Sequence, residues 1–105
     1  MITKIYRQGD VILEVVGTQK IADASEKPDL ILARGETTGH AHRITEGQAR
    51  LYAFATGVVI LKVLSEYARL YHEEHEDIIL PMGDYQIRQQ REWDWQSEVN
   101  RNVSD

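Results

Sequence analysis

The sequence predicts an all-β fold, a small single-domain β-barrel or sandwich of seven to nine short antiparallel strands. Two observations predict this class. Short runs of β-branched, aromatic or alternating residues recur along the chain, which is the pattern of strands. Turn residues, mostly glycine, separate these runs every several residues, as expected when each strand folds back beside the last in a sandwich or barrel.

The expected strands follow one another in short order. Residues 10–16 are rich in β-branched residues between Gly9 and Gly17, and the polar stretch 18–28 is expected to be a loop. Hairpin turns are predicted at 46–47 and 56–57, and a further turn at 82–84. The remaining strands are expected at 30–33, 40–45, 49–55, 58–63, 67–72, 78–81 and 85–91.

Two segments allow an alternative structure. Residues 61–76 contain neither glycine nor proline and place apolar side chains at helical spacing, so a helix competes with strands there. Residues 85–91 are polar on both faces of the expected strand. This strand either offers hydrogen bonds to a ligand or is an exposed edge that its charges protect.

The size of the chain predicts one domain. It has 105 residues, and we expect a single β domain over residues 1–95 followed by a polar tail over 96–105. Cysteine is absent, which excludes disulfides and thiolate zinc sites and fits a reducing compartment. The N-terminus is too short and polar for a signal peptide, and the apolar stretch 57–61 is far below the roughly 18 residues of a membrane helix. We therefore expect a cytoplasmic protein without membrane contact.

The charge of the chain bears on its partners. The formal net charge is −5, which disfavours broad DNA or RNA binding because a protein that binds the phosphate backbone needs a surplus of Lys and Arg. Small barrels commonly cover exposed strand edges by self-association, so a homo-oligomer is expected.

All four histidines fall in two short groups, His40 with His42 and His72 with His75. On a strand, His40 and His42 would share one face because the side-chain period is two. His72 and His75 would share a face only if a turn follows His72. Neutral imidazole is a common metal ligand, so the groups indicate a site for one divalent ion, with zinc, nickel, iron and manganese all open. The alternatives are an ordinary exposed strand pair and a solvated charged turn.

Two segments resemble the cupins, a family of small β-barrels. Residues 35–47 contain a glycine, then His40-Ala41-His42, then Glu46, and resemble the first cupin motif. The segment Pro81-Met82-Gly83 is similar to the Pro-x-Gly turn of the second. The resemblance implies a divalent metal bound by His40, His42 and Glu46. The second motif's histidine position holds Gln86, so His72 or His75 would supply the missing ligand. Together with the segment 8–11 and the segment 90–93, the histidine groups also resemble small bacterial proteins of unassigned function.

Three kinds of function remain open for this site. The leading hypothesis is a metal-dependent hydrolase or related enzyme in which Glu73 or Glu74 acts as general base on a metal-bound water. The second is a metal-independent nuclease or phosphodiesterase in which two histidines act as acid and base and Arg43 steadies the phosphate. The substrate would be a small molecule or a phosphodiester. The third is a non-catalytic binding or assembly module.

Overall fold

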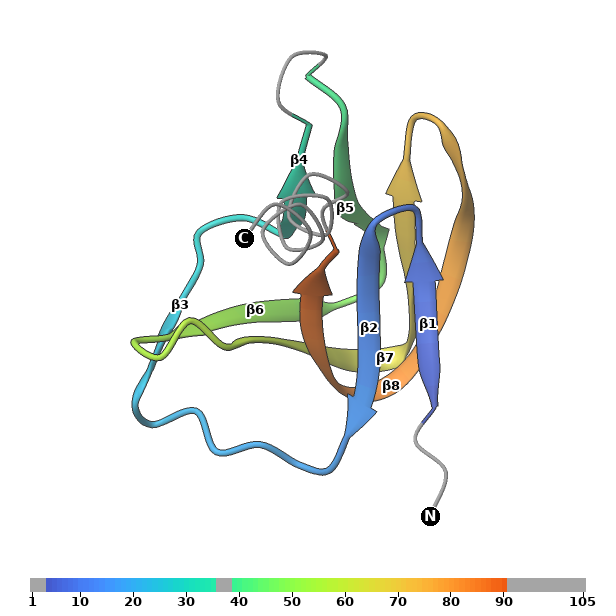
Figure 1. Cartoon of the computed structure of the whole chain (residues 1–105). Coiled ribbons are helices and arrows are strands. Elements are labelled where there is room, and N and C mark those ends of the chain that lie inside the picture. Colours follow the sequence, from blue (N-terminus) through green and yellow to red (C-terminus); the bar gives the residue numbers. More distant parts are fainter. Residues whose placement is uncertain (1–3, 36–38, 91–105) are drawn as a thin grey trace, which may run out of the picture.

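The computed structural model describes residues 4–35 and 39–90, and within these residues the chain forms eight strands and no helix. All strand pairs are antiparallel, and the sheet curls into a half-barrel (Figure 1). The all-β prediction is therefore confirmed. The described residues include no helix that is long and apolar enough to span a membrane. The strands are β1 (Ile5–Gln8), β2 (Val11–Val16), β3 (Ala24–Glu26), β4 (Ile31–Arg34), β5 (Ala41–Glu46), β6 (Ala49–Phe54), β7 (Val59–His72) and β8 (His75–Gln89).

The two long strands β7 and β8 organise the sheet. The order is β1-β2-β8-β7-β5-β4, and β6 pairs with β7 and carries β3. The first half of β7 pairs with β6 and its second half with β5. Between these halves the β7–β8 register shifts, between Val63 and Tyr67. Such an irregularity bends and twists a strand, so it lies where the curled sheet turns its corner (Figure 1).

The helical alternative for residues 61–76 is wrong, because most of this segment belongs to β7. Burial alternates along the strand: Val63 and Leu70 are buried, whereas Leu64 and Tyr67 are 47% and 40% exposed. A helix would have placed all four on one apolar stripe. The period of two, together with pairing to β5, β6 and β8, gives the strand its buried face.

Other expectations for single elements are corrected too. The turn expected at 82–84 is absent, since β8 continues through these residues and Gly83 pairs with Val63. Residues 85–87 of β8 pair with β2 on one side and β7 on the other, so the edge-strand interpretation is wrong there, whereas Arg88 and Gln89 pair with β2. Strands β1 and β3 were not expected. Residue 91 and the predicted tail at 96–105 lie outside the described residues.

One apolar core is built from side chains of β2, β6, β7 and β8. The side chains that are hidden completely from solvent are those of Val11, Leu13, Leu51, Leu61, Ala68, Leu70 and Leu80. Tyr85 closes the core from β8; its hydroxyl donates a hydrogen bond to the Pro81 carbonyl. Burial, followed by the nearby Tyr6, raises the pKa of Tyr85 to about 12, so the phenol stays a donor throughout the physiological range.

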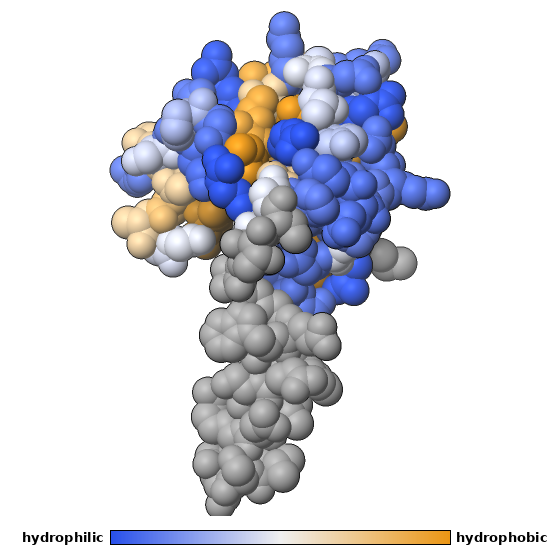
Figure 2. Space-filling model, turned by 90° about the horizontal axis from the view of Figure 1, so that it is seen from above, coloured by the Kyte–Doolittle hydropathy of each residue, from blue (hydrophilic) through white to orange (hydrophobic). Residues whose placement is uncertain are grey.

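The surface carries several exposed apolar side chains among charged ones. Seen from above, apolar side chains gather between hydrophilic areas of the surface (Figure 2). A homo-oligomer would cover part of this apolar area, and self-association stays a prediction. The large exposed apolar residues are Ile5, Val15, Leu64, Tyr67, Ile79 and Met82.

Candidate functional site

Two hairpin ends bring the four histidines together. β7 ends at His72 and β8 begins at His75, and these residues pair across the two-residue turn. Strand β5 lies beside β7, which places the His42 ring 4.2 Å from the His72 ring, centroid to centroid. His40 lies 5.8 Å from His72, and His75 lies 4.8 Å from His72 and 6.0 Å from His42. The turn that a shared site requires after His72 is therefore present.

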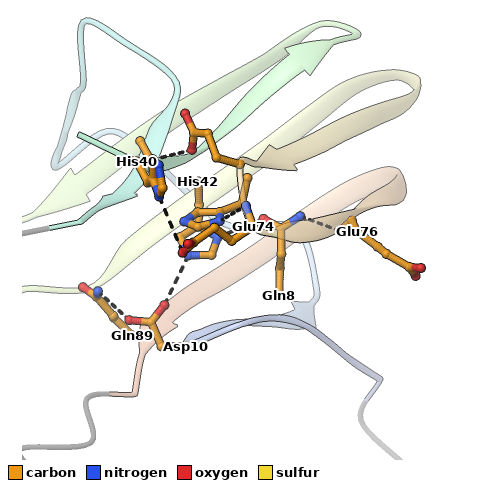
Figure 3. A network of polar contacts seen from close by, with 10 residues as sticks. Gln8, Asp10, His40, His42, Glu74, Glu76 and Gln89 are labelled. Carbon is orange, nitrogen blue, oxygen red and sulfur yellow. Dashed lines mark hydrogen bonds and ion pairs between the residues drawn. The ribbon is translucent and has the colours of Figure 1, made fainter. Parts of the chain in front are cut away.

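A buried glutamine from β1 holds His42. The Gln8 side chain is 2% exposed, and its amide nitrogen donates to the carbonyl oxygens of Leu70 at 3.0 Å and Glu76 at 2.8 Å. Its amide oxygen lies 2.8 Å from His42 Nδ1 (Figure 3). The β7–β8 register shifts between Leu70 and His72, so Gln8 binds carbonyl groups beside an interruption of the ladder.

Asp10 faces the other nitrogen of the same ring. Its Oδ1 atom lies 3.2 Å from His42 Nε2, and its Oδ2 accepts a hydrogen bond from Gln89 Nε2 at 2.9 Å (Figure 3). Partial burial raises the pKa of Asp10. The Gln89 hydrogen bond and the nearby His42 lower it by more than that, so the net pKa lies below its ordinary value. Asp10 is therefore an anion at neutral pH.

The surroundings keep His42 neutral. Burial, followed by the neighbouring His72, lowers the pKa of His42, and the attraction of Asp10 offsets this only in part. Neutral imidazole has one nitrogen lone pair, which is the form that binds metal ions or accepts a proton.

The turn between β7 and β8 contacts two of the histidines. The backbone N–H of Glu74 donates to His72 Nδ1 at 3.0 Å. The Glu74 carboxylate lies 3.5 Å from His40 Nδ1 (Figure 3). A carboxylate beside one nitrogen of an imidazole commonly orients the ring so that its other nitrogen can serve as a ligand.

Glu73 and Arg43 form a separate group. Glu73 accepts a hydrogen bond from the Ala41 backbone N–H at 3.0 Å and lies 3.1 Å from the Arg43 guanidinium. The Ala41 hydrogen bond, with Arg43 adding to it, lowers the pKa of Glu73 to about 2. Arg43 also stacks over the ring of Tyr71, at 5.0 Å from its centroid. Since side chains alternate along β5, Arg43 and His42 lie on opposite faces of the strand.

The donor atoms of the site do not converge on one point in this structure. Within residues 4–35 and 39–90, no three His, Asp or Glu side chains are arranged so that they could hold a metal ion as they stand. Glu46, the further ligand that the cupin resemblance implies, is bound to Arg69 at 2.6 Å. The structure thus brings the four histidines together and leaves Glu46 with a different partner.

Sequence reasoning missed Gln8, Asp10 and Gln89 as members of the site. Gln8 and Asp10 flank Gly9, which has a φ of +58° and begins the β1–β2 turn. A Cβ atom on Gly9 would lie 2.5 Å from His75 Nε2. Segment 8–11 stood out only through the resemblance to small bacterial proteins of unassigned function, which implies no chemistry. Gln89 belongs to the polar segment 85–91, for which a ligand-facing strand was one of two interpretations.

The fold and site define a class of protein: an antiparallel half-barrel with a partly buried imidazole cluster at its hairpin ends. The chain belongs to the family described as a domain of unknown function (DUF8820), whose model matches residues 7–90. The match spans Gln8, Asp10 and all four histidines. No curated protein and no solved structure matches the chain.

Proposed function

We propose that the imidazole cluster binds one divalent transition-metal ion. The observation that supports this most is the proximity of the four rings, whose measured centroid separations are 4.2 to 6.0 Å. Four imidazoles around a tetrahedral ion at the usual metal–nitrogen distance have centroids about 5 Å apart. These four ring pairs therefore lie near the spacing of a metal centre, although the rings must rotate to present their nitrogens.

Burial argues against incidental histidines. His42 is 4% exposed and His72 is 8% exposed, whereas histidines of an exposed strand pair or a solvated turn would lie in water. Packing polar rings in the interior has an energetic cost unless their nitrogens are bound. The Nδ1 atoms of His42 and His72 are bound by Gln8 and Glu74, so an ion would bind His42 at Nε2. A metal ion requires neutral imidazole ligands, and burial favours that form of His42.

The same site supports a proposal of hydrolysis. A metal ion lowers the pKa of a bound water, and a nearby carboxylate then accepts its proton. Glu74 is the better candidate for this base, since its carboxylate is adjacent to His40 and 68% exposed. Glu73 is held by Ala41 and Arg43 with a pKa of about 2, which makes it a weak base.

One observation favours the metal-independent phosphodiesterase as a second candidate. His42 and His72 are both buried with ring centroids 4.2 Å apart, close enough for one to act as base and the other as acid on a single substrate. Arg43 pairs with Glu73 on the other face of β5, so in this candidate it would have to leave Glu73 to reach a phosphate.

Metal content tests the proposal directly. Untagged wild type and the double variant His40→Ala/His42→Ala are purified without added metal and measured by inductively coupled plasma mass spectrometry. We expect near-stoichiometric metal in wild type and none in the double variant. The double variant Glu26→Ala/Arg50→Ala removes an exposed ion pair on β3 and β6, so it should keep its metal.

The opposite result has a clear meaning. A wild type that takes up no zinc, nickel, iron or manganese after incubation with each ion would overturn the metal proposal. Cleavage of RNA or a cyclic nucleotide that persists in chelator would then establish the second candidate. Cytoplasmic location and self-association stay predictions, and light scattering tests the latter.

A further inference from the structure

The orientation of the Gln8 amide is fixed by its partners. Its nitrogen faces two backbone carbonyl oxygens, Leu70 O and Glu76 O. Carbonyl oxygens only accept hydrogen bonds, so the amide group that faces them must be the NH₂ and not the oxygen. The amide oxygen therefore points at His42 Nδ1, 2.8 Å away.

This orientation determines which nitrogen of His42 carries the proton. An amide oxygen accepts, so Nδ1–H of His42 donates to Gln8, and in the neutral ring Nε2 holds the lone pair. That lone pair faces the Asp10 carboxylate oxygen at 3.2 Å. Two electron-pair donors at this distance repel one another unless a cation, either a proton or a metal ion, is shared between them.

His72 has the opposite arrangement. The Glu74 backbone N–H donates to His72 Nδ1 at 3.0 Å, which makes Nδ1 the acceptor and puts the proton of the neutral ring on Nε2. In this tautomer the ring offers the cluster an N–H group and not a lone pair. His72 is therefore arranged to donate a hydrogen bond.

We infer that His42 Nε2 and Asp10 Oδ1 are two ligands of the ion. His72 then donates a hydrogen bond to the water or anion that the ion binds. Gln8 is the positioning residue that holds His42 in the ligating tautomer. This inference rests on the proposed metal function and goes beyond a four-histidine site, because it replaces one imidazole by a carboxylate. His40 and His75 complete the set by rotation of their side chains. A mixed nitrogen and oxygen donor set suits zinc, iron, nickel or manganese.

The tautomers can be measured without any metal. Long-range ¹H–¹⁵N correlation spectra of the metal-free wild type, recorded at mildly alkaline pH where imidazoles are neutral, report which ring nitrogen is protonated. We expect Nδ1–H for His42 and Nε2–H for His72. In Gln8→Leu, His42 should change to a mixture of tautomers, a response that loss of packing alone would not give. The reverse tautomers in wild type would overturn the inference.

Metal affinity separates the two donor sets. If Asp10 is a ligand, Asp10→Asn weakens metal binding by at least about tenfold, and His72→Gln, which keeps an N–H group near the position of Nε2, stays within about threefold of wild type. If all four imidazoles are ligands, His72→Gln weakens metal binding by at least about tenfold, and Asp10→Asn stays within about threefold of wild type. Asp29→Asn changes a carboxylate that pairs with Arg34 outside the cluster, and it is the matched control.

The outcomes also separate the inference from the function on which it rests. Wild type that binds metal, with His72→Gln impaired and Asp10→Asn normal, refutes the donor assignment and keeps the metal function. Wild type that binds no metal refutes both proposals, whatever the tautomers. Competition with a metallochromic indicator gives the affinities, and circular dichroism verifies that each variant is folded.

Discussion

At the scale of single residues, the site depends on a glycine that takes no part in its chemistry. Gly9 has a φ of +58°, a left-handed conformation that side chains disfavour. A Cβ atom there would also lie 2.5 Å from His75 Nε2. Glycine meets both conditions without strain and without moving the His75 ring, so the β1–β2 turn can lie against the imidazole cluster.

Replacing this glycine should impair the site more than the fold. Gly9→Ala adds left-handed strain of about 1–2 kcal/mol and displaces the His75 ring, so we expect metal affinity to fall by about tenfold. Gly57 has a φ of +96° and no atom within 4 Å of an added Cβ, so Gly57→Ala should destabilise the fold and keep wild-type affinity. Equal losses of affinity in the two variants would refute the role of Gly9.

The residues of the site differ in how far the sequence predicted them. The four histidines were found because two pairs of a rare, titratable side chain stand out in any sequence. Gln8 and Asp10 were not found, because their importance comes from contacts with residues 32 to 79 positions away. Contacts of this kind depend on the curl of the sheet, which no local pattern records.

At the scale of elements, the turn between β7 and β8 is tied to β5. Glu73 in this turn accepts from the Ala41 N–H and pairs with Arg43, both of β5. These contacts hold the His72–His75 hairpin end beside the strand that carries His42. They stabilise the charged carboxylate, which is why the pKa of Glu73 falls to about 2.

The lowered pKa predicts how stability changes with acid. A carboxylate with a lowered pKa in the folded state stabilises the fold fully above its ordinary pKa, 4.5 for Glu73, and loses this contribution as the pH falls toward about 2. We therefore expect Glu73→Gln to be less stable than wild type at neutral pH. Between pH 4.5 and about 2 its stability should fall less steeply.

Urea unfolding of the metal-free proteins across this pH range measures the effect. Glu66 is exposed on the same strand as His72, and Glu66→Gln is the control that should keep the wild-type slope. A Glu73→Gln variant with the wild-type slope throughout would show that the contacts of Glu73 with β5 do not stabilise the fold.

The elements also show where local patterns mislead. Residues 61–76 combine helical spacing with strand alternation, and pairing with three neighbouring strands decides in favour of the strand. The Pro-x-Gly segment at 81–83 has the composition of a turn, yet it lies within β8 opposite the irregular part of β7. Strand β3 has only three residues and forms through its pairing with β6. Its sequence alone carries too little periodicity to predict it.

At the scale of the whole molecule, the proposed ion would connect strands that are not hydrogen-bonded to each other in the sheet. Asp10 follows β1, His42 lies on β5, and His75 begins β8. Strands β1 and β5 are separated in the sheet by β2, β8 and β7, so they meet at the cluster only because the half-barrel curls. A metal bound to these residues would therefore act as a clasp between strands that are not neighbours in the sheet.

Metal should accordingly raise the thermal stability of the whole domain. Free metal at a hundred times its Kd stabilises the folded state by about 3 kcal/mol if the unfolded chain does not bind, which for a domain of this size raises Tm by roughly 10–20 °C. Differential scanning calorimetry with zinc and then with excess chelator measures the shift. The double variant His40→Ala/His42→Ala should show no shift, because the clasp has lost two of its imidazoles. An equal shift in both proteins would mean that metal binds elsewhere on the surface, and the clasp would then be refuted.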